Sequence, residues 1–535
     1  MGMPRRRLPP TSLWLSCGAA LLVALSPRAA KADQTLTFDG TLTEGGLDHA
    51  FIDFEVPAGT QEIQIDHDDL SADDILDWGL DDPDGFRGWG GGNTEPAIVG
   101  ALAASRSYLA GPMPAGTWRV VIGKAQIAGG SADYHVVVTL RDAPTLAPQS
   151  ERAPYVAPAP LSKERRWYAG DLHAHSRESG DADPTLDDLA TFARSQGLDF
   201  VEFSDHNTVS QLDFLGAVQK KHPELLLVPG VEFTTYDGHA NGIGATRWVD
   251  HKIGQPGIDI AGAAAQFREQ GALFSINHPL LDIGDLCIGC AWKHELPADA
   301  IDAVEIATAG SASLLGNLTI DFWDTLCDTG RHVAPVGGSD DHSAGQKGGA
   351  FSTPVGTPAT FVLADGLSVE SILDGIRNSR TVVKVGGASG PMIELTSDVA
   401  PEGDTIHAER ITLHAKITGA AGLAMRWVKN GKTLQDGDVM GDVDEMEQTV
   451  DAPVSGQDRY RVEVLSGGHP VSLTGHVWLE LRKATVTPPD DSEPEVKSGC
   501  ACNLAEPAPF TPWAGMVGVL GAFGWIARRR RSLRV

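Results

Sequence analysis

His173 and His175 are separated by one alanine, within the stretch from Tyr168 to Ser176. Residues i and i+2 of a β-strand point to the same face, so two imidazoles would stand together at the end of a strand. Such a pair suits a divalent metal that prefers nitrogen ligands. The pair alone specifies little, because an exposed strand face has the same pattern. Residues further along the chain are needed to choose between the two interpretations.

Further His, Asp and Glu residues recur at or just after the points where predicted apolar strands stop. They are Asp181, Asp205, His206, Glu232, His239, His278, Asp340 and His342. In a parallel β/α barrel the C-terminal ends of several strands meet in one pocket, so these side chains would come together. Without Asp205, these residues and the pair His173 and His175 offer nine potential nitrogen and carboxylate ligands, which are more than one metal needs. They suit two or three ions, with a carboxylate such as Glu232 bridging.

Strands and helices alternate through the region that carries these residues. Thr185 is a predicted N-cap, and acidic residues in the first turn and a stop at Gly197 complete the signature of a helix. Further helices are expected over 210–222, 260–270 and 318–330, and strands over 198–203, 225–228, 272–276, 303–306 and 333–336. This alternation predicts a parallel sheet, open or closed into a barrel, over residues 165–387.

Two strand-rich segments flank this region, as expected for a chain too long for a single core. Short alternating runs between Gly, Pro and Asp clusters predict a β-sandwich over 33–143 and a second, immunoglobulin-like one over 388–484. Residues 144–164 are rich in Pro and Ala without periodicity, which predicts a linker. Trp89, within Gly88–Gly92, is either a ligand-stacking residue or, the interpretation that we favour, packed beneath a glycine-rich loop.

The motifs of the central region resemble, in order and spacing, those of the PHP (polymerase and histidinol phosphatase) family. They are Asp171-Leu-His-Ala-His175, Ser204-Asp-His-Asn-Thr208, Gly230-Val-Glu232, Asn277-His-Pro279 and Gly338-Ser-Asp-Asp-His342. The flanking sandwiches look like those of its carbaryl-hydrolase-like CehA/McbA group. The resemblance covers about residues 165–385. It implies a multidomain protein with a central distorted (β/α)7 barrel, the PHP fold, which holds two or three Mn, Fe or Zn ions.

Matched residue by residue, the resemblance also implies the metal ligands. They are His173, His175, Asp181, His206, Glu232, His239, His278, Asp340 and His342. The family usually has Ser-Asp-Gly after the His-x-His strand, whereas this chain has Ser179-Gly-Asp-Ala-Asp183. Asp181 is therefore the expected equivalent, and Asp183 is its competitor.

The metal ions that the resemblance implies also indicate the type of reaction, which is hydrolysis. A metal-bridged water loses a proton near neutral pH and becomes the nucleophile, while a metal polarises the scissile oxygen. We expect a hydrolase that cleaves a phosphoester, or a carbamate, ester or amide bond, in a small-molecule substrate. His239 or His342 would protonate the leaving group if it is not fully engaged as a ligand, and Asp205 would orient a ligand. Arg177 and Lys347 would hold a phosphate, although lone exposed cations are more often only solvated.

Two other functions compete with this one. In a surface binding or adhesion protein the sandwiches would carry the function and the barrel would be a scaffold, but a decayed site should have lost ligands. A urease-like amidohydrolase shares His-x-His, but it would have a bridging lysine where this chain has Glu232. The histidines outside the motifs are interpreted as surface or satisfied core residues; they include His49, His67, His135, His222, His251, His294 and His332.

Charge and the two termini predict where the protein resides. The formal net charge of −29 argues against nucleic acid or an anionic membrane surface as a partner. Three arginines, an apolar run and Ala30-Lys-Ala32 predict a secretory signal peptide over 1–32. Near the other end, the apolar run 510–527 is just long enough to span a bilayer and precedes four arginines.

With Cys500 and Cys502, this C-terminal segment resembles the Gly-Cys type of sorting tail of myxobacterial surface proteins. The resemblance implies processing near Cys500 and attachment of the exported protein to the membrane or cell surface through residues 500–535. A plain C-terminal anchor is the alternative. Residues 485–499, rich in Pro, Asp and Glu, are expected to be a disordered spacer.

Cys287, Cys290 and Cys327 are the cysteines of the body of the chain. A zinc knuckle would need more partners at close spacing. In an exported protein a disulfide is favoured, and three cysteines leave one thiol over. The sequence does not decide the pairing.

Overall fold

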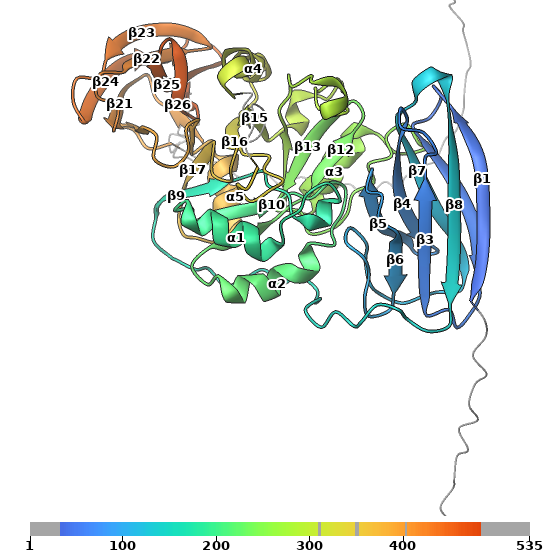
Figure 1. The fold of residues 1–535 in the computed structure, drawn as a ribbon. Coiled ribbons are helices and arrows are strands. Elements are labelled where there is room, and N and C mark those ends of the chain that lie inside the picture. The colour runs from blue at the N-terminus through green and yellow to red at the C-terminus, as the bar shows by residue number, and fades with distance from the viewer. Residues whose placement is uncertain (1–32, 309–311, 348–352, 402–403, 483–535) are drawn as a thin grey trace, which may run out of the picture. The chain divides into compact units, whose positions relative to one another are not determined.

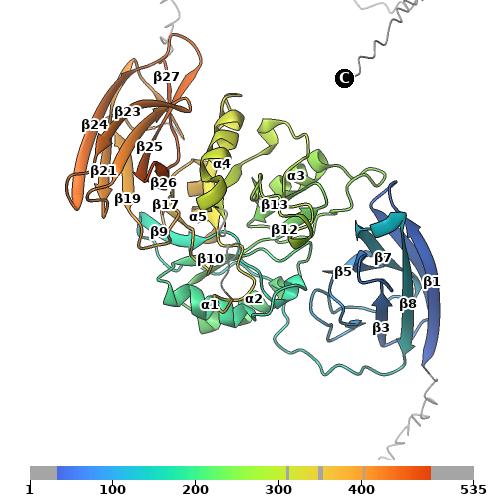
Figure 2. The same ribbon diagram turned by 45° about the horizontal axis from the view of Figure 1, so that its top comes forward.

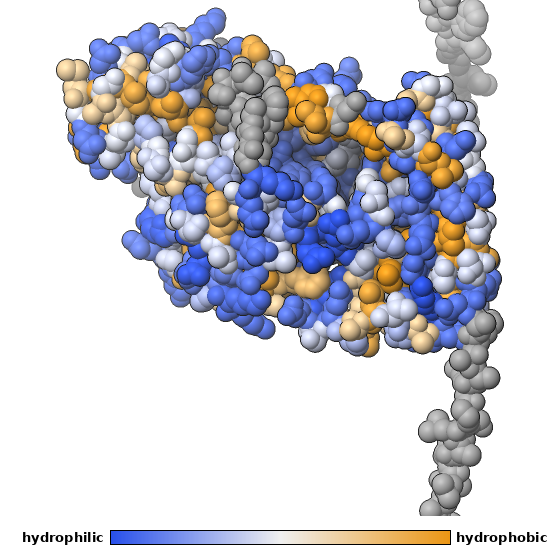
Figure 3. All heavy atoms as spheres, in the orientation of Figure 1, coloured by the Kyte–Doolittle hydropathy of each residue, from blue (hydrophilic) through white to orange (hydrophobic). Residues whose placement is uncertain are grey.

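The computed structural model describes residues 33–308, 312–347, 353–401 and 404–482 (Figure 1). The predicted signal peptide (1–32), spacer (485–499) and sorting tail (500–535) lie outside these residues. Within the described part of the chain, no helix is long and apolar enough to cross a membrane. On the face drawn in Figure 3, hydrophilic residues predominate and apolar residues form separate patches.

Residues 34–141 form two four-stranded antiparallel sheets (Figure 1 and Figure 2). The first contains, in order, β1 (Gln34–Thr43), β8 (Ser131–Arg141), β3 (Glu62–Asp68) and β6 (Ala97–Gly100). The second contains β2 (His49–Val56), β7 (Gly116–Gln126), β4 (Ile75–Asp82) and β5 (Gly85–Gly91). Alternate residues of the strands, such as Phe54, Trp118 and Val136, are buried in one apolar core between the sheets. This unit is the N-terminal sandwich.

Residues 142–165 contain no helix or named strand, yet they are held against the rest of the chain. The Arg152 guanidinium donates a hydrogen bond of 3.0 Å to Asp213 Oδ2 and lies over the ring of Phe214. The Leu161 N–H donates to the carbonyl of Leu367 at 2.8 Å. The Pro/Ala-rich segment is thus an extended connection that is fixed at several points.

The strands of the central region form two sheets. One contains parallel β11 (Leu226–Pro229), β10 (Phe200–Phe203) and β9 (Arg166–Asp171), followed by antiparallel β17 (Ala359–Ala364) and β18 (Thr381–Lys384). The other contains β12 (Glu232–Thr235), β13 (Gly238–Ile243), β14 (Leu273–Ile276), β15 (Ala303–Thr308) and β16 (Ala334–Gly338). Isolated bridges pair His206 with Glu232 and Ala174 with Asp341. Closure of these strands into one (β/α)7 barrel stays a prediction.

Five helices cover these sheets in the described part of the chain. They are α1 (Leu186–Ser195), α2 (Leu212–Lys221), α3 (Ile260–Glu269), α4 (Ala312–Cys327) and α5 (Val369–Arg377). Leu189 of α1 and Leu215 of α2 pack on β10 and β11 through Val201 and Leu227. Thr185 begins α1 with a capping box, as its sequence predicted. The short 3₁₀ helices are η1 (Ala128–Gly130), η2 (Arg177–Ser179), η3 (Gly284–Leu286) and η4 (Ala298–Ala300).

The C-terminal strands form a second pair of facing sheets around one apolar core that includes Leu413, Trp427 and Val462. One sheet contains β19 (Met392–Ser397), β21 (Arg410–Thr418) and β24 (Val443–Asp451). The other contains β26 (His469–Thr474), β25 (Gln457–Ser466), β22 (Ala424–Lys429) and β23 (Lys432–Asp438), with β27 (Val477–Glu480) and β20 (Thr405–His407). Because β26 pairs with β18, this sheet continues a sheet of the central region.

Candidate metal centre

The predicted ligands lie at strand ends. His173 and His175 follow β9, His206 follows β10, Glu232 begins β12, His239 lies in β13, His278 follows β14, and Asp340 and His342 follow β16. The Asp171 carboxylate fixes two of these loops, because its Oδ1 accepts the backbone N–H groups of His173 and Ser339, each at 3.0 Å. Gly338 permits the close approach, since a Cβ there would lie 2.3 Å from the Cβ of His173.

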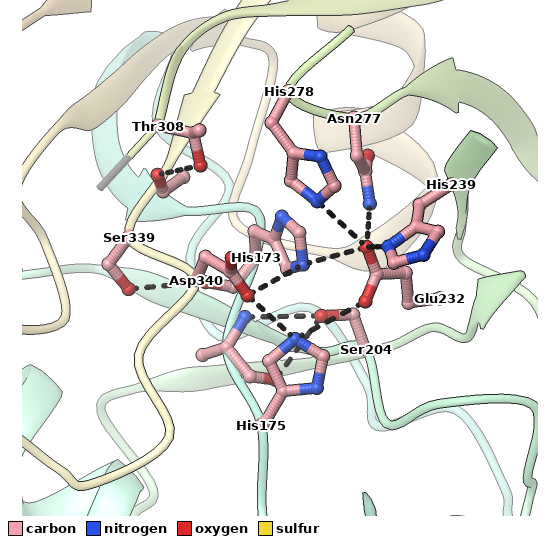
Figure 4. A network of polar contacts seen from close by, with 12 residues as sticks. His173, His175, Ser204, Glu232, His239, Asn277, His278, Thr308, Ser339 and Asp340 are labelled. Atoms are coloured by element: carbon pink, nitrogen blue, oxygen red, sulfur yellow. Dashed lines mark hydrogen bonds and ion pairs between the residues drawn. The ribbon is translucent and has the colours of Figure 1, made fainter. Parts of the chain in front are cut away.

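Glu232 is at the centre of the cluster (Figure 4). Its Oε1 lies 3.3 Å from His173 Nε2, 3.3 Å from His278 Nε2 and 3.4 Å from His239 Nδ1. Its Oε2 lies 3.5 Å from His175 Nε2 and 2.8 Å from His206 Nδ1. A carboxylate that faces five imidazoles in this way has the position expected of a ligand that bridges ions.

Asp340 and Asp181 add two further carboxylates. Asp340 Oδ1 lies 3.3 Å from His173 Nε2 and 3.1 Å from His175 Nε2. Asp181 Oδ2 lies 3.3 Å from His206 Nε2 and 3.4 Å from His342 Nε2. Asp183 pairs instead with Lys347, and both aspartates are exposed. Of the two competing aspartates, the structure therefore places Asp181 beside the histidines.

A second set of polar groups orients the histidines. Glu305 Oε1 lies 3.1 Å from Nδ1 of His173, Ser179 Oγ 3.1 Å from Nδ1 of His175, and Thr234 Oγ1 2.8 Å from Nδ1 of His206. A carboxylate only accepts, so Nδ1 of His173 must donate to Glu305, which leaves Nε2 with a lone pair for a metal. The sequence motifs did not reveal Glu305, although a single acid inside the apolar strand Ala303–Thr308 was a usable signal.

Burial makes these contacts costly without a cation. His173, His175 and Glu232 have no exposed surface. Nε2 of His173 and of His175, both ring nitrogens of His239 and Oε2 of Glu232 make no hydrogen bond with described residues. Buried polar groups without partners destabilise a fold by about 1 to 3 kcal/mol each. A divalent ion among these atoms would remove that cost.

The pKa shifts indicate mutual stabilisation of opposite charges. Burial alone would raise the pKa of Glu232, but the imidazoles of His173, His206 and His239 hold it well below its usual value. Burial and the neighbouring His342 and His206 lower the pKa of His175 to about 3. Burial alone would lower the pKa values of His173 and His206, but the facing carboxylates raise them well above the ordinary value. A metal ion binds ionised carboxylates and neutral imidazoles, so its binding would displace the protons from these two rings.

The donor atoms fall into groups of the size that a metal ion needs, each with its atoms within 4.8 Å of one another. Two such groups are His173, His175, Glu232 and Asp340, and His175, His206 and His342. A third contains His239, His278 and Cys290, but Cys290 forms a disulfide with Cys287, and Cys327 is the free, buried thiol. Nitrogen and oxygen donors of this kind fit Mn, Fe or Zn.

Backbone strain also marks this centre. His278 has φ of 25° and Asp340 has φ of 55°. Non-glycine residues in this part of φ/ψ space cost on the order of 1 to 3 kcal/mol and concentrate at functional sites.

The other residues predicted for the site have different positions. Asp205 is buried and its two oxygens accept the N–H and Oγ–H of Ser176 at 2.7 and 2.8 Å, so it fixes the residue after His175. Lys347 lines the pocket over the cluster. Arg177 is exposed and is not among the described lining residues.

A pocket of about 970 Å³ opens onto the cluster, and both the central region and the N-terminal sandwich line it. The glycine-rich segment predicted as a loop lies mostly in strand β5, and Trp89 of that strand is 5% exposed, with its ring edge-on to His251. Its burial agrees with the packing interpretation, while its place in the pocket lining also allows contact with a ligand. The interpretation of His49 and His251 as surface or satisfied core residues was wrong. Both are buried in the pocket wall, and none of their ring nitrogens has a hydrogen-bond partner among the described residues.

Comparisons with known proteins show only distant likenesses. No family model and no curated protein sequence matches the chain. A crystal structure of a two-domain Bacteroides vulgatus protein that contains a predicted PHP-like metal-dependent phosphoesterase is similar with 17% identity and a TM-score of 0.34, over 62% of this chain and 100% of that one. The CARDB domain of a Pyrococcus furiosus protein is similar with 14% identity and a TM-score of 0.13, over 17% of this chain and 97% of that one. At these TM-scores neither likeness carries an argument.

Proposed function

We propose that the chain is a metal-dependent hydrolase that holds two or three Mn, Fe or Zn ions. It cleaves a phosphoester, or a carbamate, ester or amide bond, in a small-molecule substrate. One observation carries the proposal: six histidines and two aspartates, Asp181 and Asp340, meet around Glu232, and several nitrogen and oxygen atoms of this cluster are buried and without a hydrogen bond to the described residues. The order of the motifs, which resembles that of the PHP family, supports the same function and a barrel for this region. Export and surface attachment through residues 500–535 complete the proposal.

The residues divide into groups that would hold the ions. His173, His175 and Asp340 would hold one ion together with Glu232, and His239 and His278 would hold another with the same carboxylate. Asp181, His206 and His342 would form a third position. When bound, the ions supply Lewis-acid activation of water and of the scissile oxygen.

The leaving group needs a proton. In a centre with two ions, whose third position is not used, His342 holds no ion and is better placed than His239 to deliver that proton. The side chain of His342 is 32% exposed, whereas that of His239 is 4% exposed. Both line the pocket, so the more accessible imidazole is the one that reaches a substrate oxygen.

The test is a chelation and reconstitution assay. The chain is stripped with a chelator, given Mn, Fe or Zn singly, and assayed with an aryl phosphate, an aryl phosphodiester, an aryl ester and an aryl carbamate. We expect activity on at least one substrate class to be lost with the metal and restored by it, and Glu232→Gln to abolish it. Hydrolysis that survives both chelation and Glu232→Gln would contradict the proposal. A chain that binds no metal would favour the binding or adhesion alternative.

A further inference from the structure

The N-terminal sandwich is packed onto the central region by specific contacts. Tyr236, at the tip of the hairpin formed by β12 and β13, donates a hydrogen bond of 2.6 Å to Asp77 Oδ2 of β4. The hydroxyl of Tyr236 lies against β7 at Gly123. A Cβ added at Gly123 would be only 2.2 Å from the hydroxyl oxygen, so the glycine makes this contact possible. The rings of Phe86 and Trp248 stack with centroids 4.3 Å apart. The sandwich is therefore in a position to form a permanent wall of the pocket.

The charge of this wall is negative. Apart from the predicted metal ligands, the charged side chains among the described lining residues are Asp48, Asp77, Asp237 and Lys347. Lys347 is paired with Asp183. Burial raises the pKa of Asp77 to about 6, and burial and then Asp237 raise the pKa of Asp48. Burial and mutual repulsion thus disfavour the charged forms of Asp48 and Asp77, and a cation bound beside them would offset both effects.

Two buried histidines that meet at this wall, His49 of the sandwich and His251 of the central region, give an independent indication of a ligand. His49 is 8% exposed and His251 is 3% exposed, and neither ring has a hydrogen-bond partner among the described residues. Burial and then the charge of Lys252 lower the pKa of both rings, that of His49 to about 3, so both are neutral. A neutral imidazole offers one donor and one acceptor, and leaving both unpaired costs free energy unless a polar ligand group binds there.

Aromatic and apolar side chains complete the surroundings. Trp89 and Tyr236 line the pocket beside these histidines, and aromatic rings add to the binding of a nearby cation. Another part of the lining is apolar and comes from the loop after β14, through Leu281, Ile283, Leu286 and Ile288. The pocket thus combines an acidic, aromatic side with an apolar one.

We propose that the acidic wall, defined as Asp48, Asp77, His49, His251 and Trp89, binds a positively charged amino group that the substrate carries on an apolar body. This inference rests on the proposed hydrolase and narrows its substrates. Amine-bearing esters, amides, carbamates or phosphodiesters would be favoured. Phosphomonoesters would be disfavoured, because their two negative charges would meet the additional carboxylates and no arginine is among the described lining residues.

The test measures binding of three six-carbon probes to the metal-loaded full chain by calorimetry: n-hexylamine, n-hexanol and n-hexanoate. We expect the dissociation constant of hexylamine to be roughly tenfold lower than that of hexanol, with hexanoate weakest. Hexyltrimethylammonium, which cannot coordinate a metal, should keep most of this preference. Asp77→Asn should weaken binding of both cations by about fivefold to tenfold and leave hexanol unchanged.

Asp53→Asn is the matched control, because it makes the same charge change on an exposed side chain of the same sandwich. Equal affinities for the three probes, or equal effects of Asp77→Asn and Asp53→Asn, would overturn the inference. If Asp77→Asn does not fold, Asp48→Asn takes its place. Metal content is measured on the same samples. If the chain holds metal but does not bind cationic probes more tightly, the inference about the acidic wall is wrong and the proposed hydrolase is not affected. If the chain holds no metal, the proposed function itself is contradicted.

Discussion

At the scale of single residues, Glu305 decides which nitrogen of His173 is available to a metal. Its Oε1 accepts from Nδ1 of His173, and its Oε2 accepts the backbone N–H of His278 at 2.9 Å. One carboxylate therefore sets the orientation of two predicted ligands on different strands.

Glu305→Gln is expected to weaken metal binding by about tenfold to a hundredfold, because an amide holds the correct tautomer of His173 less firmly. Affinity is measured by competition with a chromogenic chelator. Glu202→Gln is the control. Glu202 is fully buried, and burial raises its pKa well above the usual value, so the carboxyl is already neutral and an amide replaces it with little change. Equal losses in the two variants would refute the role of Glu305.

The candidate metal ligands could be predicted from the sequence, but the polar groups that orient them and the histidines of the pocket wall could not. The alternation of His173 and His175 and the polar clusters at strand ends are local patterns, so the candidate ligands were predictable. Glu305 acts on a histidine 132 positions away, and His49 meets His251 only because the sandwich packs on the central region. Such contacts depend on tertiary packing, which one sequence does not display.

At the scale of elements, the hairpin of β12 and β13 connects the predicted metal centre to the N-terminal sandwich. Gly123→Ala would place a Cβ against the hydroxyl of Tyr236 and push the hairpin tip away. We expect a loss of about 1 to 3 kcal/mol in the free energy of unfolding, as for overpacked sites.

Gly216→Ala is the matched control, because the residue lies in α2 and a Cβ added there would have nothing within 4 Å. Alanine in a helical position with room for its Cβ should stabilise by about 0.5 to 1 kcal/mol. Chemical denaturation compares the two variants. Changes of the same sign would mean that Tyr236 is not held at Gly123.

His332 joins the start of β16 to the C-terminal strands. Its Nδ1 pairs with Asp404, its Nε2 lies 2.8 Å from Gln457 Oε1, and its ring stacks on Trp478. Burial alone would lower the pKa of His332, but the Asp404 contact raises it; the same pair lowers the pKa of Asp404 against the effect of burial.

The directions of these two pKa shifts determine how the stability contributed by the pair depends on pH. A raised histidine pKa stabilises the fold fully below the ordinary value of 6.5, and this contribution is lost as the pH rises through the folded-state pKa. The stabilisation that comes from the lowered pKa of Asp404 is fully present above pH 3.8. It is lost as the pH falls through the folded-state pKa. His332→Gln should therefore cost about 1.5 to 3 kcal/mol more near pH 5.5 than near pH 9. Denaturation at both pH values checks this. An equal cost at the two values would contradict the charged pair.

The helices and most strands were predictable because their signals are local. The helix expected over 260–270 is Ile260–Glu269, and the strand expected over 272–276 is Leu273–Ile276. The pairing of β18 with β26 was not predictable, since it joins residues about ninety positions apart across an expected domain boundary. The start of α4 at Ala312 was also missed, because glycines near that end weaken the helical signal.

At the scale of the whole molecule, the extended segment after the N-terminal sandwich is fixed rather than loose. The ion pair between Arg152 and Asp213 is its main side-chain attachment to α2. Asp213→Ala should increase the rate of trypsin cleavage after Arg152 roughly tenfold, because local opening becomes less costly. Asp183→Ala, which breaks the exposed pair with Lys347, should leave that rate unchanged. Identical rates in wild type and Asp213→Ala would show that the ion pair does not hold the segment.

The central claim of this account is that Glu232 and its histidines hold metal ions, and elemental analysis of the purified full chain tests it most directly. We predict about two or three Mn, Fe or Zn ions per chain, and fewer in a folded His173→Ala variant. Absence of metal, with none taken up from Mn, Fe or Zn, would contradict the account. So would a His173→Ala chain that keeps the full complement of ions.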